Sequence, residues 1–189
     1  GQPAKMSFIT GKDRMEMEHT VKMAIFGAPG LGKTRLLKTL DCPTLCLDLE
    51  AGMLSVKDWG GDSFTVTTWQ QAKDLACVLG GPNPALKSGF SYSASDYSRA
   101  IKEFTALYGD VSLDRYKCIF IDSITVASQK CFEWAQSQPE SRTSNGHTNV
   151  LGTYGLVGRE MSAWLTQLQH IKNKDIIFVG LLDYKIVDE

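Results

Sequence analysis

One short segment, residues 27–34, combines residue types that bind phosphate. It reads GAPGLGKT and fits the pattern G-x-x-x-x-G-K-[ST]. An apolar run at 21–26 precedes it and good helix formers at 35–40 follow, so a strand should enter the loop and a helix should leave it. Glycines let successive backbone N–H groups point inward, and the positive end of the next helix adds to this anion site. The segment therefore predicts a site for the phosphates of a nucleoside triphosphate.

The side chains of this loop divide the work of the predicted site. Lys33 can reach the β and γ phosphates and stabilise the charge of the transferring group, which makes it a catalytic candidate. The hydroxyl of Thr34 is placed to ligate Mg²⁺. We assign nucleotide binding to Gly27, Ala28, Pro29, Gly30, Leu31, Gly32, Lys33, Thr34 and Arg35.

Two carboxylates follow other apolar runs of the sequence. Residues 118–121 end at Asp122, and residues 44–49 end at Glu50. Ligands bind beyond the carboxyl ends of parallel strands, which is also where the glycine-rich loop begins. We expect Asp122 to hold Mg²⁺, directly or through water. We expect Glu50, on a strand neighbouring the loop, to accept a proton from the attacking water; a solvated acid or an indirect Mg²⁺ partner is the alternative.

These groups need an alternation of strands and helices to position them. Short apolar runs predict strands buried on both faces, and apolar side chains at helical spacing predict helices between them. Thr68 and Gln71 have capping-box spacing, and Gly80 and Gly81 should end that helix. Such alternation implies an α/β fold, a mainly parallel β-sheet flanked by helices on both faces. The expected strands are 21–26, 44–49, 64–67, 118–121 and 176–179. A helix is expected over 35–40, and the apolar stripes of three further helices start at Trp69, Tyr97 and Tyr154.

A polar segment at 136–152 interrupts this alternation. It is longer than most connections in compact domains, and loops of this length are often functional or mobile. Arg142 supplies a cation, His147 a polar ring, and Tyr154 an aromatic ring that could stack a base. We expect single-stranded DNA to bind here, with a disordered connector as the alternative.

Composition limits the class of protein. The 189 residues fit one compact domain, and 43% hydrophobic with 22% charged residues is ordinary globular usage. The formal net charge of -1 means that any nucleic-acid contact needs a local patch. The N-terminal residues lack the apolar stretch of a secretory signal, and no apolar run approaches the length of a membrane helix, so we expect a cytoplasmic protein without a membrane partner. The five cysteines lack zinc-site spacing and should be reduced, buried thiols.

The order of these elements resembles the RecA-like branch of the P-loop ATPases. Residues 21–40, 45–52 and 119–123 are similar to that family's P-loop, catalytic-glutamate strand and Walker B strand. Within the branch, the chain is most similar to short phage-encoded nucleotide-binding proteins of the single-strand annealing and recombination type. The resemblance covers most of the chain and implies an N-terminal extension over 1–20 and a RecA-like ATPase domain over 21–189.

This resemblance implies Mg²⁺-dependent binding and hydrolysis of ATP, coupled to single-stranded DNA in phage recombination or annealing, in the host cytoplasm. Members commonly complete the site with a cation from the next subunit, which implies self-assembly into a ring or filament. Members also continue past the position of Glu189 into a second DNA-binding loop and further strands. The resemblance therefore implies either a domain truncated at its C-terminus or a minimal core.

One family position departs from the expected pattern. RecA-like proteins usually carry a polar residue at the end of the strand that matches 176–179, where it senses the γ-phosphate. The matching positions here are Gly180, Leu181 and Leu182. Signalling from nucleotide to DNA then requires another residue, with Asp183 or Lys185 as candidates.

Other nucleotide-binding classes fit less well. A GTPase should show N-K-x-D after a late strand, whereas residues 173–175 read NKD without the spacer and precede their strand. A P-loop nucleotide kinase should carry an arginine-rich lid, but the arginines are dispersed, so this class is a second alternative. A non-catalytic nucleotide-binding regulatory module is the third, and Glu50 separates it from an ATPase because hydrolysis needs this residue and binding does not.

Overall fold

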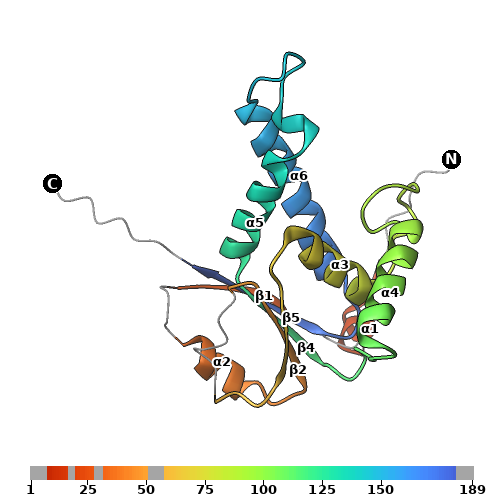
Figure 1. The fold of residues 1–189 in the computed structure, drawn as a ribbon. Coiled ribbons are helices and arrows are strands. Elements are labelled where there is room, and N and C mark those ends of the chain that lie inside the picture. Colours follow the sequence, from red (N-terminus) through yellow and green to blue (C-terminus); the bar gives the residue numbers. More distant parts are fainter. Residues whose placement is uncertain (1–7, 17–19, 28–31, 51–57, 182–189) are drawn as a thin grey trace.

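A parallel sheet, with five strands in the described residues, forms the centre of the molecule (Figure 1). The computed structural model describes residues 8–16, 20–27, 32–50 and 58–181. The strand order is β1-β5-β4-β2-β3. This sheet confirms the predicted α/β class. The strands are β1 (Lys22–Gly27), β2 (Thr44–Asp48), β3 (Asp62–Thr65), β4 (Cys118–Asp122) and β5 (Asp175–Leu181).

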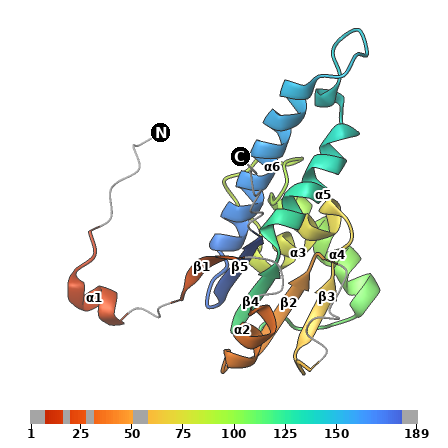
Figure 2. The same ribbon diagram turned by 90° about the vertical axis from the view of Figure 1, so that its left-hand side faces the viewer.

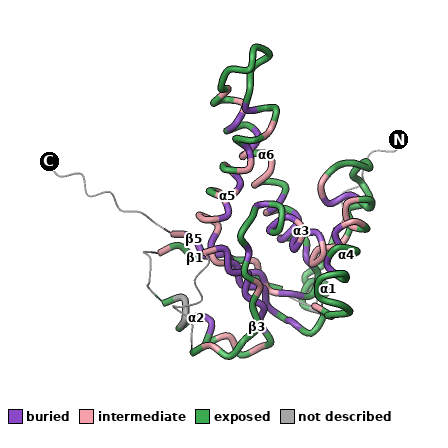
Figure 3. The backbone as a smooth tube through the Cα atoms, in the orientation of Figure 1, coloured by how far each residue is buried: buried purple, intermediate pink, exposed green. Residues whose placement is uncertain are grey.

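Helices cover both faces of this sheet, as the sequence predicts. On one face α2 (Lys33–Thr39) packs its Leu37 with Cys46, Phe120 and Val179. The other face carries the larger core, built with α3 (Trp69–Gly80), α4 (Ala94–Tyr108), α5 (Ile124–Gln136) and α6 (Val150–Gln169). Alternate residues along the strands enter the two cores because successive side chains point to opposite faces. Figure 3 shows the buried residues gathered along the strands and on the helix sides that meet them.

The capping box predicted at the start of α3 is present. The hydroxyl of Thr68 accepts from the Gln71 amide at 3.1 Å, and the Gln71 side chain accepts from the Thr68 amide at 3.4 Å. Gly81 ends the helix with φ of +74°, a conformation that glycine adopts without strain. Trp164 of α6 then donates its indole N–H to the Ala72 carbonyl at 3.0 Å, which fixes α6 across α3.

Helix α5 was not predicted from the sequence. Its buried side is made of small residues, Ala127, Cys131 and Ala135, so the helical period of apolar residues is weak there. Ser123 caps this helix by accepting from the Val126 amide at 3.2 Å. Small residues at this spacing allow α5 to lie close against its neighbours in the core.

Helices α5 and α6 form an antiparallel pair that projects from the sheet (Figures 1 and 2). The segment between them is ordered by a 3₁₀ turn at Pro139–Ser141 and a bridge between Arg142 and Thr148. At the opposite end of the chain, α1 (Gly11–Glu16) lies apart from the body in Figure 2. None of the helices in the described ranges combines the length and the apolar character that a bilayer span requires.

Candidate nucleotide-binding site

The carboxyl ends of the parallel strands gather the predicted site residues at one edge of the sheet. Strand β1 ends at Gly27, β4 ends at Asp122, and Glu50 follows the end of β2. Strands β2 and β4 are neighbours, with Asp48 in register with Asp122. The structure therefore brings Glu50 and Asp122 to adjacent strand ends, at the edge where the glycine-rich loop leaves β1.

The strand–loop–helix context that the glycine-rich motif requires is present. Gly27 closes β1, and α2 begins at Lys33. Gly32 caps α2 with φ of +83°, in the left-handed region that favours glycine. Arg35 is exposed in the first turn of α2. Ala28, Pro29, Gly30 and Leu31 lie outside the described residues, as do the side chains of Lys33 and Thr34.

Glu50 is held through both its backbone and its side chain. Its amide donates to Oδ1 of Asp48 at 3.0 Å, and its Oε1 accepts from the hydroxyl of Ser123 at 3.2 Å. The Leu49 amide donates to the Asp122 carbonyl at 2.8 Å, which continues the contact between β2 and β4 up to Glu50. Asp48 is buried, so its carboxylate supports the turn that presents Glu50. The half-buried Glu50 is thus positioned beside β4.

The strand that precedes Glu50 does not neighbour β1, because β5 and β4 lie between them. Strand β5 takes this central place since it is apolar on both faces and buried from Ile176 to Gly180. In the strand order, β4 with Asp122 is consequently closer to β1 than β2 is.

A metal ion at this edge would have few protein ligands. No group of three or more histidine, cysteine, aspartate or glutamate residues in the described ranges could form a cage for an ion. Mg²⁺ bound with phosphates commonly uses one or two protein oxygens, with the remaining ligands from phosphate and water. A carboxylate oxygen of Asp122 fits this chemistry, and the side chain of Thr34, the other expected ligand, lies outside the described residues.

Within the described residues, the end of β5 carries no polar side chain, and the polar side chain beside it comes from α5. Gly180 pairs with Phe26, and a Cβ built on Gly180 would lie 2.2 Å from Cδ1 of the Phe26 ring. The glycine therefore leaves room for this ring in place of a polar side chain. Thr125, in the first turn of α5, instead accepts from the Leu181 amide at 2.9 Å. Leu182, Asp183 and Lys185 lie outside the described residues.

Ser123 and Thr125 are the site residues that the sequence did not identify. The sequence feature that could have indicated them is the segment DSIT at 122–125, in which a serine that can cap a helix follows the acid that ends β4. The peptide bond between Asp122 and Ser123 is cis. Through Ser123 and Thr125, the first turn of α5 reaches both Glu50 and the end of β5.

The residues expected to contact DNA lie away from this edge. Arg142 and His147 are exposed in the segment that joins α5 to α6, at the tip of the projecting pair (Figure 1). Tyr154 is 60% exposed on α6, and its ring centroid lies 5.4 Å from that of Phe132. Helix α5 has 13 residues, so at about 1.5 Å per residue it separates Ser123 from the tip by about 20 Å.

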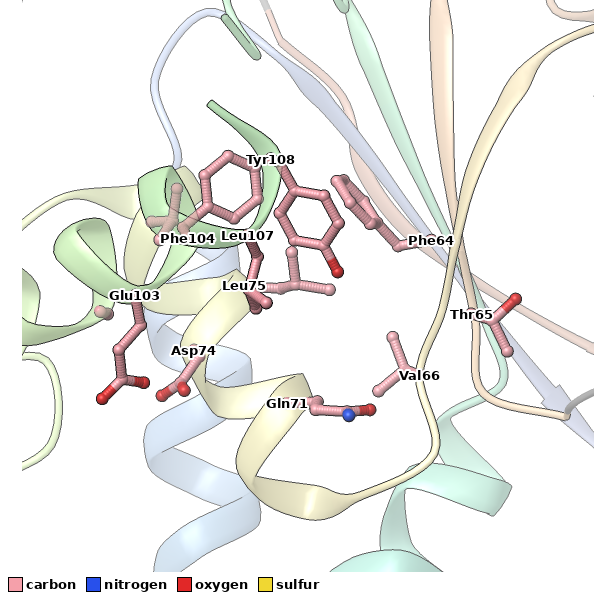
Figure 4. Close-up of a pocket in the computed structure, with 12 residues that line it drawn as sticks. Phe64, Thr65, Val66, Gln71, Asp74, Leu75, Glu103, Phe104, Leu107 and Tyr108 are labelled. Carbon is pink, nitrogen blue, oxygen red and sulfur yellow. The ribbon is translucent and has the colours of Figure 1, made fainter. Parts of the chain in front are cut away.

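A separate apolar pocket lies beside β3, the outer strand on the side of the sheet away from β1 (Figure 4). Phe64 of β3, Leu75 of α3 and the α4 residues Phe104 and Tyr108 line it. Strands β5, β4 and β2 lie between this strand and β1. Because aromatic and aliphatic groups dominate it, this pocket lacks the chemistry of a phosphate site.

Comparison with known proteins agrees with the geometry of the strand edge. A family model described as an AAA domain matches residues 19–189. A search of curated proteins found no match. The matched range contains the glycine-rich loop and both acids of the site, Glu50 and Asp122. The chain therefore belongs to the AAA domain family and has an α/β core of the P-loop ATPase type.

Proposed function

We propose that the protein is a Mg²⁺-dependent ATPase that acts with single-stranded DNA in phage recombination or annealing. The observation that carries the ATPase proposal is that the glycine-rich motif and the two acids lie at the same edge of the sheet. The motif at 27–34 begins there, Asp122 ends β4 there, and Glu50 follows the end of the adjacent strand β2. Phosphate binding, a metal ligand and an acceptor for a water proton are the parts that hydrolysis requires.

The residues of this edge divide the reaction among them. Amides of the loop and Lys33 bind the phosphates, and Lys33 stabilises the charge that develops on the γ-phosphoryl group. Thr34 and Asp122 would hold Mg²⁺, which when bound supplies positive charge to the phosphate oxygens. Glu50 orients the attacking water and accepts its proton. The hydrogen bond from Ser123 holds the Glu50 carboxylate at this edge.

Phosphate release tests the proposal directly. Release is measured from ATP and from GTP, with Mg²⁺ or EDTA, and with and without single-stranded DNA. We expect release from ATP that needs Mg²⁺ and rises with DNA. Lys33→Ala should lose nucleotide binding or turnover, and Glu50→Gln should bind a nonhydrolysable ATP analogue normally while its kcat falls by about 100-fold or more.

Glu133→Gln is the matched control, since Glu133 is an exposed glutamate on α5. It should hydrolyse ATP at the wild-type rate. Wild-type phosphate release by Glu50→Gln would contradict the assignment of Glu50. Binding of ATP with no release by the unmodified protein would instead indicate a non-catalytic nucleotide-binding module.

A further inference from the structure

We propose that Ser123 is a positioning residue that sets the orientation of the Glu50 carboxylate for hydrolysis. This inference rests on the proposed ATPase function. Ser123 follows Asp122 at the end of β4 and is fully buried, at 0% exposure. Its hydroxyl donates to Oε1 of Glu50 at 3.2 Å.

The same hydroxyl also accepts a hydrogen bond from the first turn of α5. The Val126 amide donates to it at 3.2 Å. A serine hydroxyl has one hydrogen to donate and two lone pairs to accept, so the two bonds can exist together. The amide fixes the position of the Ser123 oxygen, which leaves its hydrogen to be directed at Glu50. The donor to Glu50 is therefore itself anchored by a rigid element.

Orientation matters because of the shape of a glutamate side chain. The terminal torsion of glutamate has a broad, roughly two-fold profile, so a carboxylate takes a defined orientation only when neighbours fix it. A general base has to lie within hydrogen-bond reach of the proton that it accepts. Small displacements of a catalytic group reduce turnover much more than they reduce binding of the substrate. Removal of the Ser123 hydroxyl should therefore lower kcat for ATP and leave KM nearly unchanged.

Ser123 has a structural part as well, because it caps α5. Replacing a serine cap by alanine commonly costs about 1 kcal/mol of stability. Ser93 provides a matched control for this effect. It is also 0% exposed, and it caps α4 by accepting from the Asp96 amide at 3.3 Å. Ser93→Ala removes the same kind of buried cap from a helix that does not begin at the Glu50 strand edge.

The experiment compares Ser123→Ala, Ser93→Ala and Glu50→Gln in the full chain. The measurements are kcat and KM for ATP, affinity for a fluorescent nonhydrolysable ATP analogue, and the melting temperature. We expect Ser123→Ala to lose about 10- to 100-fold in kcat, with KM and analogue affinity within about twofold of wild type. Ser93→Ala should lower the melting temperature similarly and keep kcat within about twofold.

A double variant shows whether Ser123 acts through Glu50. Glu50→Gln combined with Ser123→Ala should have the same kcat as Glu50→Gln alone, because residues that act as a unit are not additive. Independent, multiplicative losses would overturn the inference. So would a wild-type kcat in Ser123→Ala, or an equal kcat loss in Ser93→Ala.

Two further outcomes keep the tests distinct. If Glu50→Gln itself releases phosphate normally, the proposed function fails; if Glu50→Gln is inactive and Ser123→Ala is not, this inference alone fails. Should Ser123→Ala not fold, Ser123→Cys keeps a side chain of similar size with a much weaker donor. A reduced kcat in Ser123→Cys supports the inference, and a wild-type kcat overturns it.

Discussion

Ser123 and Glu50 lie 73 positions apart in the sequence and still share a hydrogen bond. The bond exists because β2 and β4 are adjacent parallel strands, so their carboxyl ends meet. Sequence spacing could indicate that Glu50 and Asp122 each end a strand, but it could not show that these strands are neighbours. The hydroxyl of Ser123 is thereby within hydrogen-bond distance of the Glu50 carboxylate.

The five cysteines also show how local environment sets chemistry. All five are free thiols. Burial raises the pKa of Cys77, Cys118 and Cys131 to about 12, and Cys46 is buried as well. At pH 8 we expect at most one thiol, that of the half-buried Cys42, to react rapidly with a disulfide reagent, because the thiolate is the reactive form.

Spectrophotometric titration of the thiols measures this reactivity. Five thiols should react in urea, and Cys42→Ser should abolish the rapid reaction of the native protein. Rapid reaction of two or more thiols in the folded state would contradict the burial of these residues.

At the scale of elements, a cluster of charges joins α3 to α4. Arg99 of α4 donates to Asp74 of α3 at 2.7 Å, to Asp96 at 2.8 Å and to Glu103 at 3.0 Å. Burial acts to raise the pKa of Asp96, but hydrogen bonds from the Tyr92 amide and the Arg99 guanidinium outweigh it and lower that pKa. The cluster therefore stabilises the fold while Asp96 is ionised.

Arg99→Met should reduce the free energy of unfolding by about 1 kcal/mol at pH 7, the scale of a partly exposed charged hydrogen-bond network. Because the folded pKa of Asp96 lies below its ordinary value of about 3.9, this stabilisation is present above that pH and is lost as the pH falls further. Urea unfolding at pH 7 and pH 3 measures the change. Lys102→Met, which removes an exposed charge from the same helix, is the control. An equal effect of Arg99→Met at both pH values would contradict this role.

An element could be predicted from the sequence when the interactions that form it involve residues close together in the chain. The capping box at Thr68 and Gln71 involves neighbouring residues, and the structure confirms it. Helix α5 has no comparable signal, because its buried face consists of alanines and a cysteine. The order of strands depends on pairings between distant segments, so the sequence did not show that β5 and β4 lie between β1 and β2. The apolar runs themselves marked each strand to within a few residues.

Helices α5 and α6 bear on the proposed contact with DNA. Arg142 and His147 lie at the tip of this pair, and the largely exposed Tyr154 lies nearby on α6. Combined Arg142→Ala and Tyr154→Ala should weaken binding of a labelled single-stranded oligonucleotide by about 10-fold or more, since stacking is worth about 1–3 kcal/mol per base. The slope of affinity against salt should fall by about 0.7 for the lost cation.

Fluorescence anisotropy at several salt concentrations gives both quantities. The matched control is Lys102→Ala with Tyr108→Ala, a cation and an exposed aromatic residue on α4. It should bind the oligonucleotide with wild-type affinity and salt slope. Unchanged binding by the Arg142 and Tyr154 variant would contradict a DNA contact at the tip.

At the scale of the whole molecule, β1 exposes apolar side chains at one side of the sheet. Within the described residues β1 is an edge strand, and Met23 is 42% exposed, with Ile25 and Phe26 exposed beside it. Exposed apolar edge strands favour pairing with another chain. We propose that a second copy of the chain covers this edge when the protein assembles into a ring or filament.

Light scattering tests assembly with and without Mg²⁺–ATP and single-stranded DNA. The mass should rise to a multiple of one chain with both ligands present. Met23→Lys should remain a monomer, because assembly would bury a lysine charge at the edge of β1 without a partner. Leu107→Lys alters an apolar residue that is 75% exposed beside the opposite edge strand, β3, and should assemble like the wild type. Loss of assembly in Leu107→Lys alone would place the contact at β3, and a single-chain mass under every condition would contradict assembly itself.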